Sequence, residues 1–374
     1  MIADSRSTGV ETVDKMWNIF FHFFLDKEST AFLEAQCEKL LHESTSLNAW
    51  SRSEYSSFLR FCNEHTLLEL RRHWQLYVDA GRFPPKRKRE VRETVLLEMR
   101  KIRTRREIGY SGCRSAGPYF LQSSTPVRAV FDHFWTTGTT FVNEEVLSST
   151  TNTNPTFVHS IAGTTFAVHF GTTPIAPFHL EPAFLRSKPS STVASDLIDC
   201  ARSQFRSWVT SFQTFLGEHP GMITIRFFCG EALRFCQALA EYRATGSISE
   251  DQTVASWDTT PLVFDGPYYV LGNTSTPLTF NVIETSNLVD HVGLLNVLIA
   301  ITPLLSETHS ATLFTETLLC VRDDATKSFN RQLCADLPTT SAKVSITFCF
   351  SHFYLSFFRF MPITFGTFRE LICG

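Results

Sequence analysis

The sequence predicts an α/β fold in which a parallel sheet follows a large N-terminal helical region. The strongest observation is an ordered series of four segments: a short apolar run at 280–284, a polar turn at 285–287, a helix-length apolar stretch at 292–305 and a second apolar run at 311–319. Strand, helix and strand in this order form a βαβ unit. Such a unit requires parallel strands and a right-handed crossover.

Strand and helix also alternate upstream of that unit. Residues 193–216 carry apolar side chains at helical spacing, residues 222–229 (MITIRFFC) have the composition of a buried strand, and Gly230 starts another helix. This alternation predicts an α/β half over residues 161–340. Ligands of parallel sheets bind where the strands end, which makes 284–291 the most informative loop.

The preceding chain divides by composition. Residues 1–110 are expected to form a helical region, in which Asn63 is a suitable N-cap for a helix that Gly81 ends. Residues 111–160 are rich in Gly, Ser, Thr and Asn, and are expected to form a loop-rich linker region. Residues 341–374 are a Phe-rich tail that continues neither pattern.

The composition is that of a globular chain: 374 residues, 43% hydrophobic, 19% charged, with a formal net charge of −3. The polar start has no signal-peptide core, and Arg359 and His352 argue against a membrane span at 344–365. The ten cysteines include no CxxC pair, so the spacing of a zinc finger is missing. We expect an intracellular protein, cytoplasmic or nuclear, with no metal site and no membrane partner.

A basic run at 86–106 holds ten Lys or Arg residues, including KRKR at 86–89. One interpretation is a nuclear import signal or a nucleic-acid-binding patch. The other is a solvated helix face, because Glu90, Glu93 and Glu98 lie among the basic residues and the whole chain is slightly acidic. Short basic runs are common, which favours the solvated face.

Motifs for phosphate or catalytic sites are missing. The chain has no GxGxxG, GxxxxGK[ST], GxSxG or HExxH sequence. His169, His179 and His291 fall beside expected strand ends, where they would suit ligands or general bases. No convergent carboxylates or cysteines accompany them, so structural histidines are the favoured interpretation.

Two acids are better placed. Glu231 and Glu284 end or follow expected parallel strands, where a nucleotide-binding sheet uses acids to hold ribose or adenine groups. Glu231 is equally compatible with an acid in the first turn of a helix, and for Glu284 the structural interpretation is favoured. Asn287 or Asp290 would serve as a helix cap without any ligand.

Several segments resemble a family of fungal proteins of unknown function, many of which carry a C-terminal MYND-type zinc finger. The core of the match is FNVIETSNLVDHVGLLNVLIAITPLL at 280–305, and the resemblance spans about residues 12–340. Further matching segments are VDKMWNIFFHFFLDKEST (13–30), YSSFLRFCNEHTLLELRRHW (55–74), CRSAGP (113–118), FDHFWTTGTTF (131–141), FAVHFGTTPIAPFHL (166–180) and IRFFCGEALRFC (225–236).

The resemblance implies a partial Rossmann-like sheet of the class I methyltransferase type, similar to the domain of dynein axonemal assembly factors. IRFFCGEAL then resembles the third strand with its adenine-side acid, and FNVIETSN the fourth strand with its substrate-side loop. The implied cofactor-binding residues are Gly230, Glu231, Ala232 and Asn287. The implied substrate-side residues are Asp290 and His291.

This chain departs from the family at both ends. The glycine-rich cofactor loop and the ribose-binding acid of the family would lie upstream of Met1, and no MYND cysteines follow 332–341. Val344 and Ser345 can be encoded by GTGAGT, the form of an intron donor, so residues 344–374 are interpreted as translated intron and the chain as truncated at both ends.

The functional expectation is a non-catalytic interaction or assembly module whose partner is a protein. In this form the chain would hold no cofactor, and no catalytic residue is assigned. The first alternative is an S-adenosylmethionine-dependent methyltransferase in its complete form. The second is a nuclear or nucleic-acid-binding protein that acts through residues 86–106.

Overall fold

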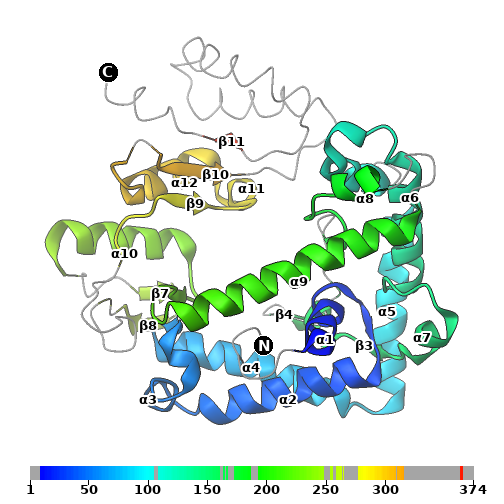
Figure 1. Cartoon of the computed structure of the whole chain (residues 1–374). Coiled ribbons are helices and arrows are strands. Elements are labelled where there is room, and N and C mark those ends of the chain that lie inside the picture. The colour runs from blue at the N-terminus through cyan, green and yellow to red at the C-terminus, as the bar shows by residue number, and fades with distance from the viewer. Residues whose placement is uncertain are drawn as a thin grey trace. The chain divides into compact units, whose positions relative to one another are not determined.

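The computed structural model describes residues 9–104, 108–160, 163–164, 166, 172–186, 193–247, 253–255, 258–262, 264, 277–308, 310–315 and 363–364. The chain forms two compact units, Met1–Phe227 and Phe228–Gly374, called unit 1 and unit 2 below (Figure 1). Helices dominate the described part of both units, and the strands are short.

Unit 1 is built mainly of helices. Its helical elements are α1 (Val10–Phe21), α2 (Lys27–Glu43), α3 (Leu47–Trp50), η1 (Glu54–Ser57), α4 (Glu64–Gly81), α5 (Pro85–Arg103), η2 (Ile108–Tyr119), α6 (Ser124–Thr137), α7 (Glu144–Ser149), η3 (Pro155–Phe157), α8 (Glu181–Arg186) and α9 (Ala194–Glu218). Its strands are β1 (Phe24–Leu25), β2 (Leu59–Phe61), β3 (Asn152–Thr153), β4 (His159–Ser160), β5 (Gly163–Thr164) and β6 (Ile225–Phe227).

The expected helix boundaries in unit 1 are confirmed where the capping chemistry is explicit. The side chain of Asn63 accepts a hydrogen bond from the N–H of Thr66, and α4 ends at Gly81. Pro85 begins α5, where its missing N–H costs no helical bond. The long helix expected at 193–216 is α9.

Residues 111–160 are more helical than their composition predicts. Helix α6 buries Val127, Val130, Phe131, Phe134 and Trp135, which recur at helical spacing on one face. Most Gly, Ser, Thr and Asn residues of this stretch precede or follow α6 in the sequence. The average composition of 111–160 therefore hides the apolar face of the helix.

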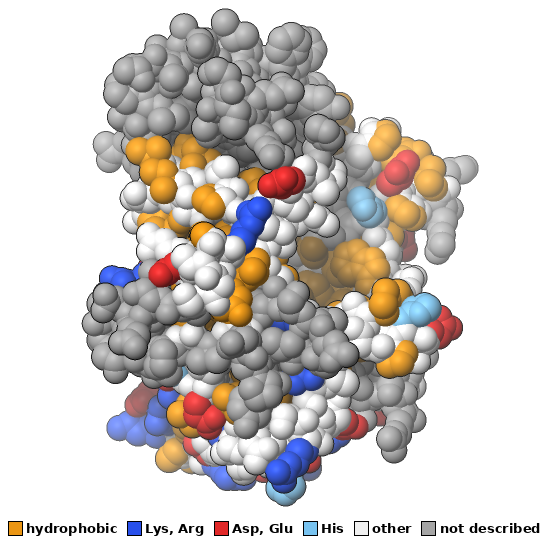
Figure 2. All heavy atoms as spheres, turned by 90° about the vertical axis from the view of Figure 1, so that its left-hand side faces the viewer, with side chains coloured by type: hydrophobic (Ala, Val, Ile, Leu, Met, Phe, Trp, Pro, Cys, Tyr) orange, Lys and Arg blue, Asp and Glu red, His pale blue; other side chains and the backbone are white. Residues whose placement is uncertain are grey.

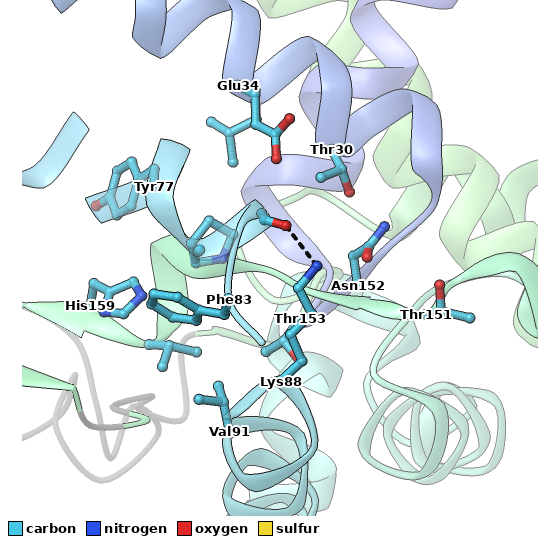
Figure 3. A pocket seen from close by; sticks show the side chains of 15 residues that line it. Thr30, Glu34, Tyr77, Phe83, Lys88, Val91, Thr151, Asn152, Thr153 and His159 are labelled. Carbon is cyan, nitrogen blue, oxygen red and sulfur yellow. Dashed lines mark hydrogen bonds between the residues drawn. The ribbon is translucent and has the colours of Figure 1, made fainter. Parts of the chain in front are cut away.

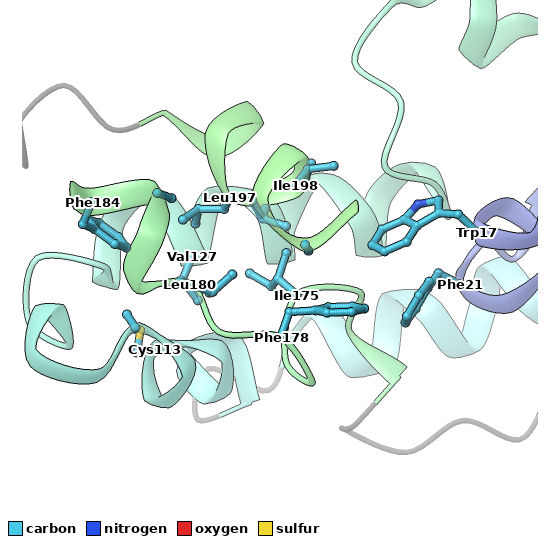
Figure 4. Close-up of a cluster of buried hydrophobic side chains, with 14 residues drawn as sticks. Trp17, Phe21, Cys113, Val127, Ile175, Phe178, Leu180, Phe184, Leu197 and Ile198 are labelled. Carbon is cyan, nitrogen blue, oxygen red and sulfur yellow. The ribbon is translucent and has the colours of Figure 1, made fainter. Parts of the chain in front are cut away.

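The largest core cluster of unit 1 joins α1, α6 and α9 to the segment 175–180 (Figure 4). Trp17 and Phe21 lie at one end of it, with their ring centroids 4.3 Å apart, and Trp17 also packs on Phe178 at 5.7 Å. Phe184 lies at the other end. Side chains from η2 and α8 also belong to it, so segments distant in the sequence share one apolar interior.

The strand at 222–229 is shorter, more exposed and differently paired than expected. It is β6, and it pairs in parallel with β2 through Ile225 opposite Leu59 and Phe227 opposite Phe61. Ile225 and Phe227 are each 38% exposed, so the expectation of a buried strand is wrong. The rings of Phe61 and Phe227, which lie opposite each other in this pair, stack with their centroids 5.8 Å apart.

Unit 2 contains the predicted βαβ unit. Its elements are α10 (Ala232–Thr245), β7 (Thr253–Ala255), β8 (Asp258–Pro261), β9 (Val282–Glu284), α11 (Leu288–Val292), α12 (Leu294–Ile301), η6 (Thr302–Leu304), β10 (Thr312–Thr315) and β11 (Ile363–Thr364). Strands β9 and β10 are parallel, with α11 and α12 between them in the chain, and β11 pairs antiparallel with β10.

The α/β character predicted from the sequence is confirmed, whereas a single Rossmann-like sheet is not formed by the described residues. Strands β6 and β9, which the resemblance likens to the third and fourth strands of one sheet, belong to separate small sheets of orders β2-β6 and β11-β10-β9. Most of residues 165–171 and 316–340, on which further expected strands fall, lie outside the described residues.

A buried polar network ties α1 to the turn after α6. His22 is fully buried, and its Nε2 accepts a hydrogen bond from the N–H of Thr140 at 3.1 Å and lies 2.8 Å from Thr140 Oγ1. The same hydroxyl oxygen accepts bonds from Trp17 Nε1 at 3.3 Å and from Arg202 at 3.0 Å. Nε2 is therefore unprotonated and His22 is neutral.

Asn154 completes the anchoring of α1. Its buried amide donates to the carbonyls of Ile19 and His22, each at 2.8 Å, and its Oδ1 accepts from the N–H of Thr156. The last carbonyls of a helix have no partner within the helix, so a buried helix end needs such donors. Asn154 supplies them from a segment more than a hundred residues away.

Unit 1 is expected to lose stability in acid through His22. Burial, with a smaller contribution from Arg202, holds the pKa of His22 well below its usual value, so only the unfolded chain takes up the proton near pH 6. Stability contributed by the neutral ring is present above about pH 6.5 and is lost as pH falls below it. We predict that wild type loses up to about 2 kcal/mol more unfolding free energy than His22→Gln between pH 7 and pH 5.

Urea unfolding followed by tryptophan fluorescence measures this, because Trp17 and Trp135 are buried in unit 1. Equal losses in both proteins would show that His22 is not the group responsible.

Gly138 ends α6 with a left-handed φ of 75°, and a Cβ there would lie 2.6 Å from Cδ2 of Phe24. Gly221, also in unit 1, has a φ of 83° and open space around the same position. We predict that Gly221→Ala costs about 1–2 kcal/mol of unfolding free energy from backbone strain alone. Gly138→Ala is expected to cost about 1–3 kcal/mol more from overpacking. Urea midpoints of the two variants test this, and equal losses would contradict the packing argument.

Candidate functional site

The residues expected on the cofactor side lie at the start of α10. Glu231 is the N-cap, and its carboxylate accepts hydrogen bonds from the N–H groups of Leu233 at 3.2 Å and Arg234 at 2.7 Å. Gly230 and Ala232 flank it and are exposed. These bonds satisfy two N–H groups that the helix itself leaves unpaired. The capping interpretation of Glu231 explains the geometry without a ligand.

The substrate-side residues lie at the start of α11. Asn287 precedes the helix without a side-chain capping bond, and its Nδ2 lies 3.4 Å from Nε2 of His291. Asp290 donates its backbone N–H to the carbonyl of Asn287 at 3.0 Å. Ser286 has a left-handed φ of 47°, which makes the turn between β9 and α11 tight. Glu284 ends β9 and is exposed.

Both segments rest on one core. Leu233 and Cys236 of α10 pack against the cluster formed by Val289, Val297 and other side chains of α11, α12 and β10. Burial, with a smaller contribution from Glu231, raises the pKa of Cys236 to about 11, so its thiol is not a nucleophile at neutral pH. The apolar packing of unit 2 thus positions both candidate segments, but it supplies no activated group.

The histidines that the structure describes are not gathered into a metal site. Among the described residues, no group of three or more His, Cys, Asp or Glu side chains could hold an ion. His179 is described through its backbone, which bonds to the side chain of Gln204, and His169 lies outside the described residues.

Most of the basic run at 86–106 lies in α5, where residues 86–90 are exposed, as the solvated-face interpretation predicts. Several of its cations nevertheless make contacts with other residues of unit 1. Arg87 stacks on Phe83 at 4.0 Å, Lys88 Nζ donates to the carbonyl of Gly81 at 2.6 Å, and Arg92 stacks on the ring of Phe24. A nucleic acid would have to compete with these contacts, which weakens the nucleic-acid interpretation.

A cavity of about 60 Å³ lies in unit 1 between α2, the end of α4, the start of α5 and the segment 151–159 (Figure 3). Its charged side chains are Glu34 and Lys88, which point into the same space. Tyr77, Phe83 and His159 form part of its wall. Burial, with smaller effects of Arg87 and His73, lowers the pKa of His159, which keeps this ring neutral at pH 7.

Sequence reasoning did not identify this cavity. Glu34 and Lys88 lie on different helices, and neither belongs to a motif. In the sequence, Lys88 is recognisable only as a member of the basic run at 86–106. The chain alone carries no signal that these two side chains share a space, because their proximity depends on the turn at Gly81–Pro85.

Helix α12 presents apolar side chains on both faces. Leu294, Val297, Leu298, Ala300 and Ile301 are buried, while Leu295 is 37% and Ile299 65% exposed. The helix contains no charged residue. Figure 2 shows hydrophobic side chains at the surface on the side of the molecule that carries α10 and α12. A helix that is hydrophobic all round is normally covered on all sides.

Within the described residues, no helix is both long and apolar enough to span a lipid bilayer. Comparisons with protein-family models, curated proteins and solved structures find no match to this chain.

The capping role of Glu231 leads to a prediction for unit 2. We expect Glu231→Ala to lower its unfolding free energy by about 1 kcal/mol, because two N–H groups of α10 lose their acceptor. Glu231→Ser should restore most of that loss, since serine is a preferred N-cap. Urea unfolding monitored by hydrogen exchange of α10 amides measures both. Equal stability of the Ala variant and wild type would contradict the capping role.

Proposed function

We propose that this chain is a non-catalytic protein-interaction or assembly module, as the resemblance to the fungal MYND-finger-associated family implies. The observation that carries this proposal is the exposed apolar face of α12. Leu295 and Ile299 are one helical turn apart, so they form a single ridge rather than two scattered side chains.

The energetics favour a protein partner over solvent for this ridge. Complete burial of a leucine or isoleucine side chain contributes about 1.5–3 kcal/mol each. The buried face of α12 already packs on the core of unit 2, so the helix stays rigid when the ridge is covered. A preorganised apolar ridge binds with a small loss of conformational entropy. The partner that fits it presents a complementary apolar surface.

The methyltransferase alternative draws less support from the geometry. Glu231, its only adenine-side acid, is occupied by its own helix, and the βαβ unit of β9 and β10 does not include β6. A calorimetric titration of the full chain with S-adenosylmethionine tests this alternative. Micromolar binding that Glu231→Gln weakens would favour the enzyme.

The interaction proposal predicts a specific loss on changing the ridge. We expect the double variant Leu295→Asn, Ile299→Asn to fold as wild type does, because both side chains are exposed, and to lose stoichiometric protein partners in quantitative affinity purification from the native organism. The matched control is Leu121→Asn, Leu185→Asn, which removes two leucines of unit 1 that are 81% and 65% exposed.

The control variant should retain every partner. Loss of the same proteins from both variants, or a partner set unchanged by the ridge variant, would contradict the proposal. Sedimentation of the purified chain distinguishes self-association, since a dimer that the ridge variant abolishes would identify a second copy as the partner.

A further inference from the structure

The cavity of unit 1 has the size of a small-molecule site. One buried water needs about 10–15 Å³ of such volume. A cavity of about 60 Å³ therefore has room for roughly four to six non-hydrogen atoms. A nucleotide or a peptide side chain with its backbone would not fit.

The carboxylate of Glu34 favours positive charge in the cavity. The carboxylate of Glu34 lies against the Cα of Gly81, so that a side chain at position 81 would overlap Glu34 Oε1. Gly81 is the last residue of α4, where the helix dipole is negative and carbonyl groups lack helical partners. A carboxylate at the negative end of a helix favours a cation nearby, and the Lys88 ammonium lies at this helix end, 2.6 Å from the Gly81 carbonyl.

The ammonium group of Lys88, which also lies beside Gly81, favours negative charge in the cavity. Lys88 reaches the cavity from α5, and its Nζ donates one hydrogen bond, to the carbonyl of Gly81 at 2.6 Å (Figure 3). An ammonium group has three N–H donors, so two remain for a ligand. Lys88 is exposed, so its ammonium group lies at the mouth of the cavity.

These two charges do not neutralise each other. No ion pair within the described ranges joins Glu34 to Lys88, although both line the same cavity. Nearby charges do close such pairs: Arg82 contacts Glu38 at 3.1 Å, and Lys39 contacts Glu54 at 2.7 Å. Glu34 and Lys88 thus face a common space with opposite charges that no ion pair joins.

We infer that this cavity binds a small zwitterion of the size of a short-chain amino acid. Its ammonium group would contact Glu34 and the carboxyl end of α4, and its carboxylate would contact Lys88. Tyr77 and Phe83 supply apolar walls on either side of these contacts. This site lies in unit 1 and does not depend on the interaction surface proposed for α12.

Glycine is the probe that tests the inference, because it has five non-hydrogen atoms and both charges. Saturation-transfer NMR with the full chain is expected to show binding with a Kd of about 1 mM, a value typical of so small a ligand. Acetate and methylamine, which each carry one of the two charges, should bind at least tenfold more weakly.

The variants Glu34→Gln and Lys88→Met should each weaken glycine binding at least tenfold. Their matched controls are Glu38→Gln and Lys86→Met, which change the same residue types on α2 and α5 outside the cavity lining. Gly81→Ala gives a further variant, in which the new methyl group displaces the Glu34 carboxylate. Circular dichroism confirms that each variant is folded.

Three results would overturn the inference. The first is no glycine signal at about 20 mM ligand, well above the expected Kd. The second is methylamine or acetate binding as tightly as glycine, which would indicate a site for a single charge. The third is an equal loss of binding in the control variants, which would indicate a general effect of surface charge.

Discussion

The buried hydrogen bond between His22 and Thr140 is the constraint on which the arrangement of unit 1 depends. It joins the end of α1 to a turn more than a hundred residues later, and Trp17 and Arg202 bring α1 and α9 to the same hydroxyl group. A neutral imidazole is required, since a protonated Nε2 would face the N–H of Thr140 and stand close to the half-buried Arg202. Removing one partner of such a network leaves the others buried and unsatisfied, which costs more than the bond itself contributes.

This constraint extends to the cavity. Directly after His22 the chain forms β1, where Phe24 pairs with Thr153 and Leu25 with Asn152. Asn152 and Thr153 are part of the cavity lining, so the segment that closes the cavity is placed by the anchoring of α1. The ring of Phe24 packs against Gly138, which is possible because Gly138 has no side chain. The cavity is thus a consequence of tertiary contacts between segments distant in sequence, rather than of any single element.

Local signals were sufficient for much of the fold. The cap at Asn63, the helix at 194–218 and the βαβ order after residue 280 each depend on spacing or turn chemistry within one segment, and each is confirmed. Pairing could not be predicted in the same way. Strand β2 is short, contains Arg60 and lies in a helical region, so nothing local shows that it is the partner of β6. Helix α6 was hidden because its apolar face is interspersed with the residues that composition assigns to loops.

Charged residues show the same division between local and tertiary information. Glu231 could be assigned two roles from sequence, and only its bonds to Leu233 and Arg234 distinguish a cap from an adenine ligand. Lys88 belongs by sequence to a basic run, yet its contact with Gly81 places its ammonium opposite Glu34. A run of charges can be recognised in the sequence, whereas two opposite charges that line one cavity are recognised only in the fold. The second arrangement is the one that specifies a ligand, because each of the two charges favours a ligand group of the opposite sign.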